Sequence, residues 1–210
     1  MALEKSQIWP VVHAERKALA SDLQGLSESQ WSSASLCGTW TVRDVTAHMT
    51  AAGSITPPSF FGKMIGSGFS FERVQAAGVA AQRGSDPADT LARFETIATS
   101  VKHPPGPLDT VLGETIIHAE DIRRPLGIQH EYPAGAVLRL AGFFQGSNLI
   151  IGTKRRIAGL SLRATDADWS HGSGPEVRGP LMSLLMAMTG RKAALDDLSG
   201  EGVAALRARD

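Results

Sequence analysis

Residues 113–127 have the sequence GETIIHAEDIRRPLG, and this stretch carries the most informative pattern in the chain. Glu114 and His118 are four residues apart, so on a helix their side chains share one face and can reach the same ion. Asp121 joins them in a narrow polar stripe at about 100° per residue, with apolar residues on both sides. Because an unpaired buried carboxylate is costly, this stripe faces either a binding site or a buried hydrogen-bonded network.

A third candidate metal ligand, His48, lies in another predicted helix. That helix begins after Thr41, where the segment TVRD fits the capping-box pattern. Two imidazoles and one carboxylate satisfy zinc and leave one coordination position open, as in catalytic zinc sites, and iron(II), nickel or manganese also accept this set. Asp44 and Asp121 are candidates for orienting the two imidazoles, with solvated surface charge as the alternative for each.

Helical patterns dominate the first 150 residues of the chain, and Gly, Pro and Ser clusters separate them. Several helices joined by short loops favour a helical bundle, with one longer excursion between two of its helices. The predicted helices cover about residues 9–26, a segment that begins at residue 41 and includes His48 and Ala52, a short piece within 53–68, and residues 88–101, 109–123 and 135–151.

The composition changes toward the carboxyl end. Residues 159–165 alternate as a strand does, and the turn-rich stretch that follows is expected to hold a second short strand. Residues 180–189 form a compact apolar helix, and a last helical piece covers residues 202–209.

These patterns predict a mainly α protein with a domain boundary near Lys154. Residues 1–154 would form the helical bundle, and residues 155–210 a small α/β domain. Because about 55 residues is close to the size at which a core is marginal, we expect the small domain to pack against the bundle.

Charge and hydropathy restrict the class of partner. The 21 Lys and Arg residues balance the 21 Asp and Glu residues, so net charge does not favour nucleic acid as a partner. The start of the chain lacks the apolar segment of a signal peptide, and no stretch approaches the roughly 18 apolar residues of a membrane span. We therefore expect a soluble cytoplasmic protein without membrane partners.

Cys37 is the only cysteine, which excludes an intrachain disulfide and a thiolate metal cluster within one chain. The simplest interpretation of Cys37 is a small apolar residue packed beside Trp40. Any sulfur chemistry is then expected to come from a ligand.

Three segments together resemble the mycothiol-dependent maleylpyruvate isomerase family of actinobacteria: residues 37–48 (CGTWTVRDVTAH), 113–127 and 179–191 (GPLMSLLMAMTGR). The resemblance implies an amino-terminal DinB-like four-helix bundle whose zinc ligands correspond to His48, Glu114 and His118. It also implies a small carboxy-terminal α/β domain similar to sterol carrier proteins.

The same resemblance implies mycothiol as a cofactor, together with a small electrophilic substrate. An open zinc position can bind a thiol sulfur and favour its deprotonation near neutral pH. In the isomerase, the thiolate adds to the double bond of maleylpyruvate, rotation follows, and elimination gives the trans isomer; related transferases leave the thiol attached to an electrophile. A homodimer is a further expectation.

Arg191, in the segment TGR at the end of an apolar helix, is the candidate for a catalytic role and for contact with mycothiol or an anion. The alternative is a cation that interacts with the carboxyl end of the helix dipole.

Two hypotheses compete with a mycothiol-dependent enzyme. The same three ligands would serve a metal-containing binding or regulatory protein, which a fourth protein ligand such as His13 or Asp44 would favour. They would also serve a metal hydrolase that uses bound water in place of the thiol.

Overall fold

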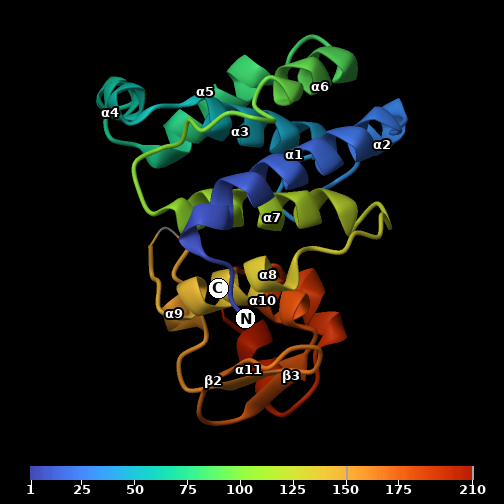
Figure 1. The fold of residues 1–210 in the computed structure, drawn as a ribbon, viewed down its shortest axis with the longest axis vertical. Helices are drawn as coiled ribbons and strands as arrows, with labels where there is room; N and C mark the ends of the chain where they lie inside the picture. Colours follow the sequence, from blue (N-terminus) through green and yellow to red (C-terminus); the bar gives the residue numbers. More distant parts are fainter. Residues whose placement is uncertain (150, 210) are drawn as a thin grey trace. The chain divides into compact units, whose positions relative to one another are not determined.

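Figure 1 shows the computed structural model of the chain, which describes residues 1–149 and 151–209. The chain divides into two compact units, one formed by Ser6–Glu131 and the other by Met1–Lys5 together with Tyr132–Asp210. Among the described helices, none is both long and apolar enough to cross a membrane.

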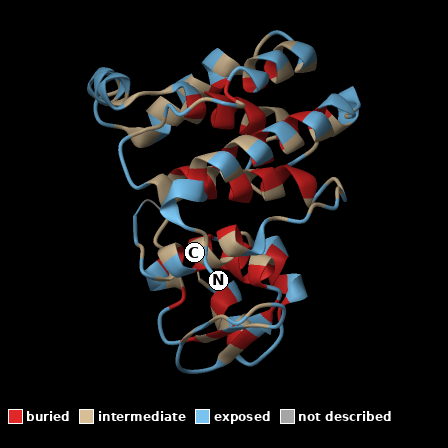
Figure 2. Ribbon diagram, in the orientation of Figure 1, coloured by how far each residue is buried: buried red, intermediate tan, exposed pale blue. Residues whose placement is uncertain are grey.

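The first unit is entirely helical among its described elements. Its helices are η1 (Lys5–Gln7, at the junction), α1 (Ile8–Gln24), α2 (Glu28–Trp31), α3 (Val42–Ser54), α4 (Pro57–Gly66), α5 (Phe71–Gln82), α6 (Pro87–Glu95) and α7 (Leu108–Arg123). Helix α1 packs against α6 and α7, and α3 packs against α5, α6 and α7. Buried residues recur along α1, α3 and α7 (Figure 2), and the packing of these helices agrees with the predicted helical bundle.

Helix α3 begins where the capping-box pattern predicts. The Thr41 hydroxyl accepts a hydrogen bond from the backbone N–H of Asp44 at 3.2 Å, and the Asp44 carboxylate accepts the Thr41 N–H at 3.0 Å. Thr46 and Thr50 are buried and donate to the carbonyls one turn earlier, each at 2.9 Å. The polar groups of this buried helix are therefore largely satisfied within α3 itself.

The predicted helix over residues 88–101 is shorter in the structure, since α6 ends at Glu95. Beyond it, Ile97 and Ser100 donate to carbonyls three residues earlier, at 3.0 Å each, so the chain continues as tight turns. The carbonyls of Ile97 and Ser100 also accept hydrogen bonds from the side chain of Arg16, on α1.

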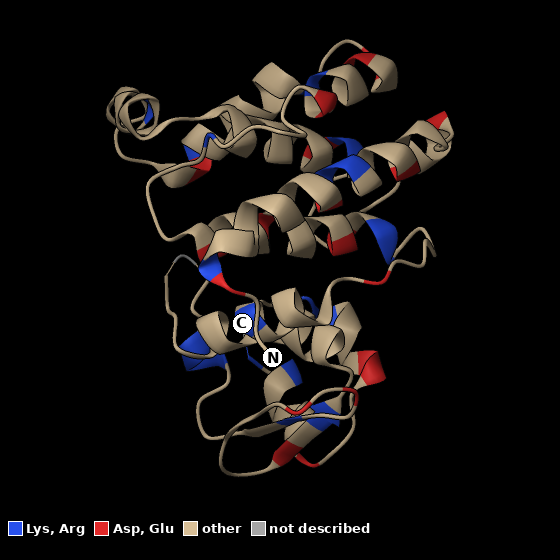
Figure 3. Cartoon of the chain, viewed as in Figure 1, with Lys and Arg blue, Asp and Glu red and all other residues tan. Residues whose placement is uncertain are grey.

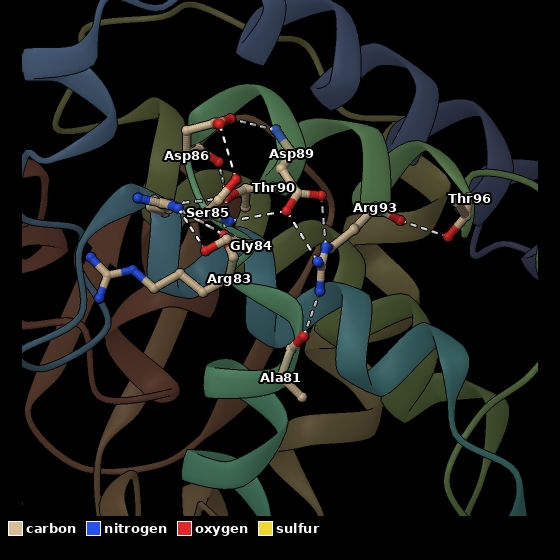
Figure 4. A network of polar contacts seen from close by, with 10 residues as sticks. Ala81, Arg83, Gly84, Ser85, Asp86, Asp89, Thr90, Arg93 and Thr96 are labelled. Atoms are coloured by element: carbon tan, nitrogen blue, oxygen red, sulfur yellow. Dashed lines mark hydrogen bonds and ion pairs between the residues drawn. The ribbon is translucent and has the colours of Figure 1, made fainter.

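Figure 4 shows a polar network at the connection between α5 and α6. The guanidinium of Arg43, on α3, donates to the carbonyl of Gly84 at 3.0 Å and to the Thr90 hydroxyl at 2.9 Å. Arg93 donates to the carbonyl of Ala81 at 2.7 Å and pairs with Asp89 at 2.9 Å. The network attaches this connection to α3, the helix that carries His48.

A second polar network joins α1 to the end of α7. The Arg123 side chain is fully buried, and its Nε donates to Asp22 at 2.7 Å. Glu15 lies 3.7 Å from Arg123 Nη1 and 2.7 Å from His130 Nε2. Figure 3 shows both acidic and basic residues along the helices of this unit.

The second unit combines helices with a small sheet. Its elements are α8 (Ala134–Gln145), α9 (Thr153–Arg156), β1 (Ser161–Ala164), β2 (Ser170–Gly172), β3 (Glu176–Gly179), α10 (Leu181–Met188), η2 (Lys192–Asp197) and α11 (Gly202–Arg207). The strand order is β2-β1-β3, with β1 antiparallel to β2 and parallel to β3. The predicted fold class, mainly helical with a small α/β part, is confirmed.

The division into compact units differs from the predicted boundary near Lys154. Helix α8 packs against α10, and the backbone N–H of Leu3 donates to the carbonyl of Gly135 at 2.9 Å. Helix α8 therefore belongs to the same compact unit as the sheet, because its apolar face is covered by α10. Residue 150, which the predicted helix 135–151 included, lies outside the described residues.

Candidate metal centre

Helices α3 and α7 bring His48, Glu114 and His118 together. One ligand atom from each residue lies within 4.8 Å of the others. His48 Nε2 is 2.7 Å from Glu114 Oε1, and His118 Nε2 is 3.6 Å from the same oxygen. The two imidazole rings meet edge to face with their centroids 5.0 Å apart. The structure thus places the three predicted ligands in one cluster.

Neighbouring side chains restrict both imidazoles. His48 is only 9% exposed, and the Trp40 ring lies 4.9 Å from it. His118 Nδ1 lies 2.8 Å from a carboxylate oxygen of Asp121, whose side chain is completely buried. Because the carboxylate accepts the proton on Nδ1, the tautomer with a free Nε2 lone pair is favoured when His118 is neutral.

The electrostatic surroundings of His118 favour its cationic form in the metal-free protein. Burial acts to lower the pKa, but the charge of Glu114 and hydrogen bonds to Asp121 and Cys37 outweigh it and raise the pKa to about 10. A divalent cation would replace the proton as the positive charge at this position.

The residues present fit a bound divalent metal ion. Two imidazole nitrogens and one carboxylate oxygen converge, and Asp121 supports one of the imidazoles as in known histidine–metal sites. A second set of potential ligands, Cys37, His118 and Asp121, shares His118 with the first. Asp121 already accepts from His118 Nδ1, so the geometry favours the first set.

Cys37 differs from its interpretation as an apolar residue packed beside Trp40. The residue is half-buried, and its thiol lies in the hydrogen-bonding surroundings of His118. The tight turn formed by residues 37–40, in which the Trp40 N–H donates to the Cys37 carbonyl at 3.1 Å, holds the thiol there. A lone cysteine in the sequence carries no signal of this contact.

Asp121 and Asp44, the two carboxylates predicted as candidates for orienting the imidazoles, differ in what they contact. Asp121 orients His118, whereas the Asp44 carboxylate caps α3 and pairs with Arg83 at 3.3 Å. Among the described residues, neither His13 nor Asp44 belongs to a group of potential metal ligands. The structure therefore offers three protein ligands at this cluster.

Arg191 follows the carboxyl end of α10 in the second unit. Its guanidinium Nη1 donates to the carbonyl of Thr189 at 2.9 Å, which is the helix-end interaction given as the alternative to ligand binding. A role for Arg191 in binding mycothiol or in catalysis stays a prediction.

The sequence and the structure were also compared with known proteins. Residues 12–106 match the family model described as the mycothiol maleylpyruvate isomerase N-terminal domain. The resemblance recognised from the sequence motifs is therefore confirmed over residues 12–106, which are similar to the mycothiol maleylpyruvate isomerase N-terminal domain.

Two solved structures are similar over both units. A crystal structure of a mycothiol-dependent maleylpyruvate isomerase has a TM-score of 0.66 at 15% sequence identity, covering 95% of this chain and 93% of that one. A mutant of such an isomerase has a TM-score of 0.68 at 14% identity with the same coverage. No curated protein matches the sequence. At these identities the similarity of the structures establishes the fold.

Proposed function

We propose that this protein is a metal- and mycothiol-dependent enzyme that performs cis–trans isomerisation in the manner of maleylpyruvate isomerase, or thiol addition or transfer. The observation that carries the proposal is the cluster of His48, Glu114 and His118 at mutual ligand distance, in a chain whose residues 12–106 match this family model. Three protein ligands leave room for an exogenous one, which is typical of catalytic rather than structural zinc sites.

Each residue of the cluster has a distinct part in this proposal. His48, Glu114 and His118 hold the ion, with zinc as the expected metal, and Asp121 fixes the orientation of His118. When bound, the ion supplies a positive charge that favours the thiolate form of mycothiol. The Trp40 ring, packed against His48, limits access of water on that side.

The isomerisation needs no net transfer of atoms. The thiolate sulfur adds to one carbon of a double bond conjugated to a carbonyl, and the electron pair of that double bond moves toward the carbonyl oxygen. Rotation about the resulting single bond follows. The electron pair then returns, the carbon–sulfur bond breaks, and the thiolate is released unchanged. A transferase would instead protonate the carbon and retain the carbon–sulfur bond.

Two other functions are compatible with the same three ligands: a metal-containing binding or regulatory protein and a metal hydrolase. Among the described residues, no fourth ligand completes the cluster, and this favours an exogenous ligand over a closed structural site. The family match favours a thiol over water as that ligand.

Metal content and thiol dependence test the proposal together. We expect His48→Ala, Glu114→Ala and His118→Ala each to lose most of the bound metal, because two protein ligands compete poorly with water. Glu120→Ala is the matched control: it lies on the same helix, and its carboxylate pairs with Arg124 at 2.8 Å. Elemental analysis of the purified variants gives the readout.

Turnover of maleylpyruvate is then measured with and without mycothiol in the wild-type protein and in Glu120→Ala. We expect turnover only when the thiol is present. Full metal content in all three ligand variants would refute the assignment of the ligands. Thiol-independent consumption of an ester or amide would support the hydrolase, and metal binding without any turnover would support the binding protein.

A further inference from the structure

Arg16 lies at the middle of α1 and is buried, with only 3% of its surface exposed. One guanidinium nitrogen, Nη1, donates to the carbonyls of Ile97 and Ser100, each at 3.0 Å. These carbonyls belong to the turns after α6, and the Ser100 hydroxyl donates to the carbonyl of Gly53 at 2.9 Å. The guanidinium is therefore fixed between α1, the end of α3 and this turn segment.

The rest of the Arg16 guanidinium has no partner. In the part of the chain that the structure describes, Nε and Nη2 form no hydrogen bond, and Arg16 forms no ion pair. Burial lowers the pKa of Arg16 to about 10, while Glu114 acts to raise it, so the side chain is charged at neutral pH. A buried cation without a direct counter-ion is costly, and an anionic ligand would remove that cost.

The Nη2 side of the Arg16 guanidinium lies close to α3, the helix that carries His48. Nη2 approaches Gly53, five residues after His48, so closely that a Cβ atom added to Gly53 would lie 3.3 Å from it. Glu114 is the group whose charge acts on Arg16. If Glu114 binds a cation, its negative charge is compensated there, and the positive field around Arg16 becomes stronger.

One turn before Arg16, His13 presents a second unpartnered polar atom on the same face of α1. His13 Nε2 is buried and has no hydrogen-bond partner. The Trp9 ring lies 5.7 Å from the His13 ring, and His103, in the loop after the turn segment, lies 6.0 Å from the Trp9 ring. Residues three apart on a helix are neighbours, so His13 and Arg16 can contact one ligand.

We propose that Arg16 and His13 form a carboxylate-binding subsite beside the candidate metal centre, and that it holds an acidic group of the electrophilic substrate. This assignment rests on the proposed function for its substrate class. The planar guanidinium presents parallel N–H groups that match the two oxygens of a carboxylate, which a lysine cannot do. The subsite would select electrophiles that carry a carboxylate over uncharged ones.

Maleate is a suitable probe, since it is a small cis dicarboxylate that undergoes no turnover without the thiol. Its binding to the full-length, zinc-loaded protein is measured by calorimetry for the wild type, Arg16→Met, Arg16→Lys and His13→Leu. Lys17→Met is the matched control, because it removes one positive charge from an exposed position next to Arg16. Circular dichroism and zinc content are measured for every variant.

We expect Arg16→Met to weaken maleate binding by about tenfold to 100-fold, the range for losing charge-assisted hydrogen bonds in a buried site. Arg16→Lys should recover part of this loss, and His13→Leu should weaken binding severalfold. Lys17→Met should change it by less than about twofold, as expected of an exposed charge. Zinc content should stay that of the wild type throughout.

Equal maleate affinity in the wild type and Arg16→Met, or an equal loss in Lys17→Met, would overturn the subsite. If Arg16→Met fails to fold, Arg16→Lys and His13→Leu decide, and wild-type affinity in both would overturn it. A different result would show that the proposed function itself is wrong. Loss of thiol dependence with maleate binding still sensitive to Arg16 would retain the subsite and reject the mycothiol-dependent reaction.

Discussion

Replacing Asp121 by asparagine tests how much the orientation of His118 contributes to metal binding. The Asp121 carboxylate is completely buried and lies 2.8 Å from His118 Nδ1. Asparagine has nearly the same shape and can still accept a hydrogen bond, but it carries no charge. The backbone carbonyl of Asp121, which accepts from the Leu36 N–H at 3.0 Å, is unaffected by the substitution.

The expected loss follows from the geometry of this contact. Groups that orient a metal-binding histidine contribute about tenfold to 100-fold to metal affinity, or about 1.4 to 2.7 kcal/mol. Because the asparagine side chain would retain an acceptor, we expect Asp121→Asn near the lower limit, at about tenfold. Asp121→Ala removes the acceptor and leaves His118 Nδ1 unsatisfied, so its loss should approach about 100-fold.

Zinc affinity is measured by competition with a chelator of known affinity, on protein first stripped of metal. Glu120→Gln provides the control, since it removes one negative charge from the neighbouring position of α7, where the carboxylate pairs with Arg124. Unchanged zinc affinity in Asp121→Asn, or an equal loss in Glu120→Gln, would show that the contact with His118 does not support metal binding.

Two further predictions concern pH and Arg191. In the metal-free fold the pKa of His118 is raised from 6.5 to about 10. The protonated imidazole therefore stabilises the fold fully below about pH 6.5, and this stabilisation is lost as the pH rises through 10. Chemical unfolding at several pH values measures the loss. Because His118 is protonated near neutral pH, zinc must displace that proton to bind. The apparent zinc affinity should therefore rise about tenfold per pH unit near neutrality, and calorimetry should detect stoichiometric proton release. A zinc affinity that does not change with pH would contradict the assignment of His118 as a ligand. If Arg191 contacts mycothiol, Arg191→Met should raise the KM for the thiol without changing zinc content. Unchanged kinetics would instead support a structural role for Arg191, through contacts such as its hydrogen bond to Thr189.

Those parts of the site that depend on local spacing could be predicted from the sequence. Glu114 and His118 share a face because a helix repeats every 3.6 residues, and Thr41 and Asp44 mark a helix start because a capping box spans four residues. Asp121 follows from the same helical periodicity. These features need no knowledge of how the helices pack.

The remaining features depend on contacts between segments far apart in the chain. His48 meets Glu114 only through the packing of α3 on α7. The residue type made His48 a candidate ligand, but only the family resemblance placed it in one site with Glu114 and His118. Arg16 binds carbonyls more than 80 residues away, so nothing near it in the sequence indicates burial. Helix α8 has an amphipathic pattern that does not reveal whether its partner is α7 or α10.

The opposite charges of the adjacent residues Glu15 and Arg16 restrict changes in the length of α1. Glu15 meets Arg123 and His130, while Arg16, about 100° further round α1, meets the carbonyls of Ile97 and Ser100. A one-residue shift of α1 in one direction would place the Arg16 guanidinium against Arg123, and a shift in the other direction would place the Glu15 carboxylate against those carbonyls. Either encounter is repulsive. The orientation of α1 about its own axis is thus fixed electrostatically, and insertions or deletions within this helix should not be tolerated.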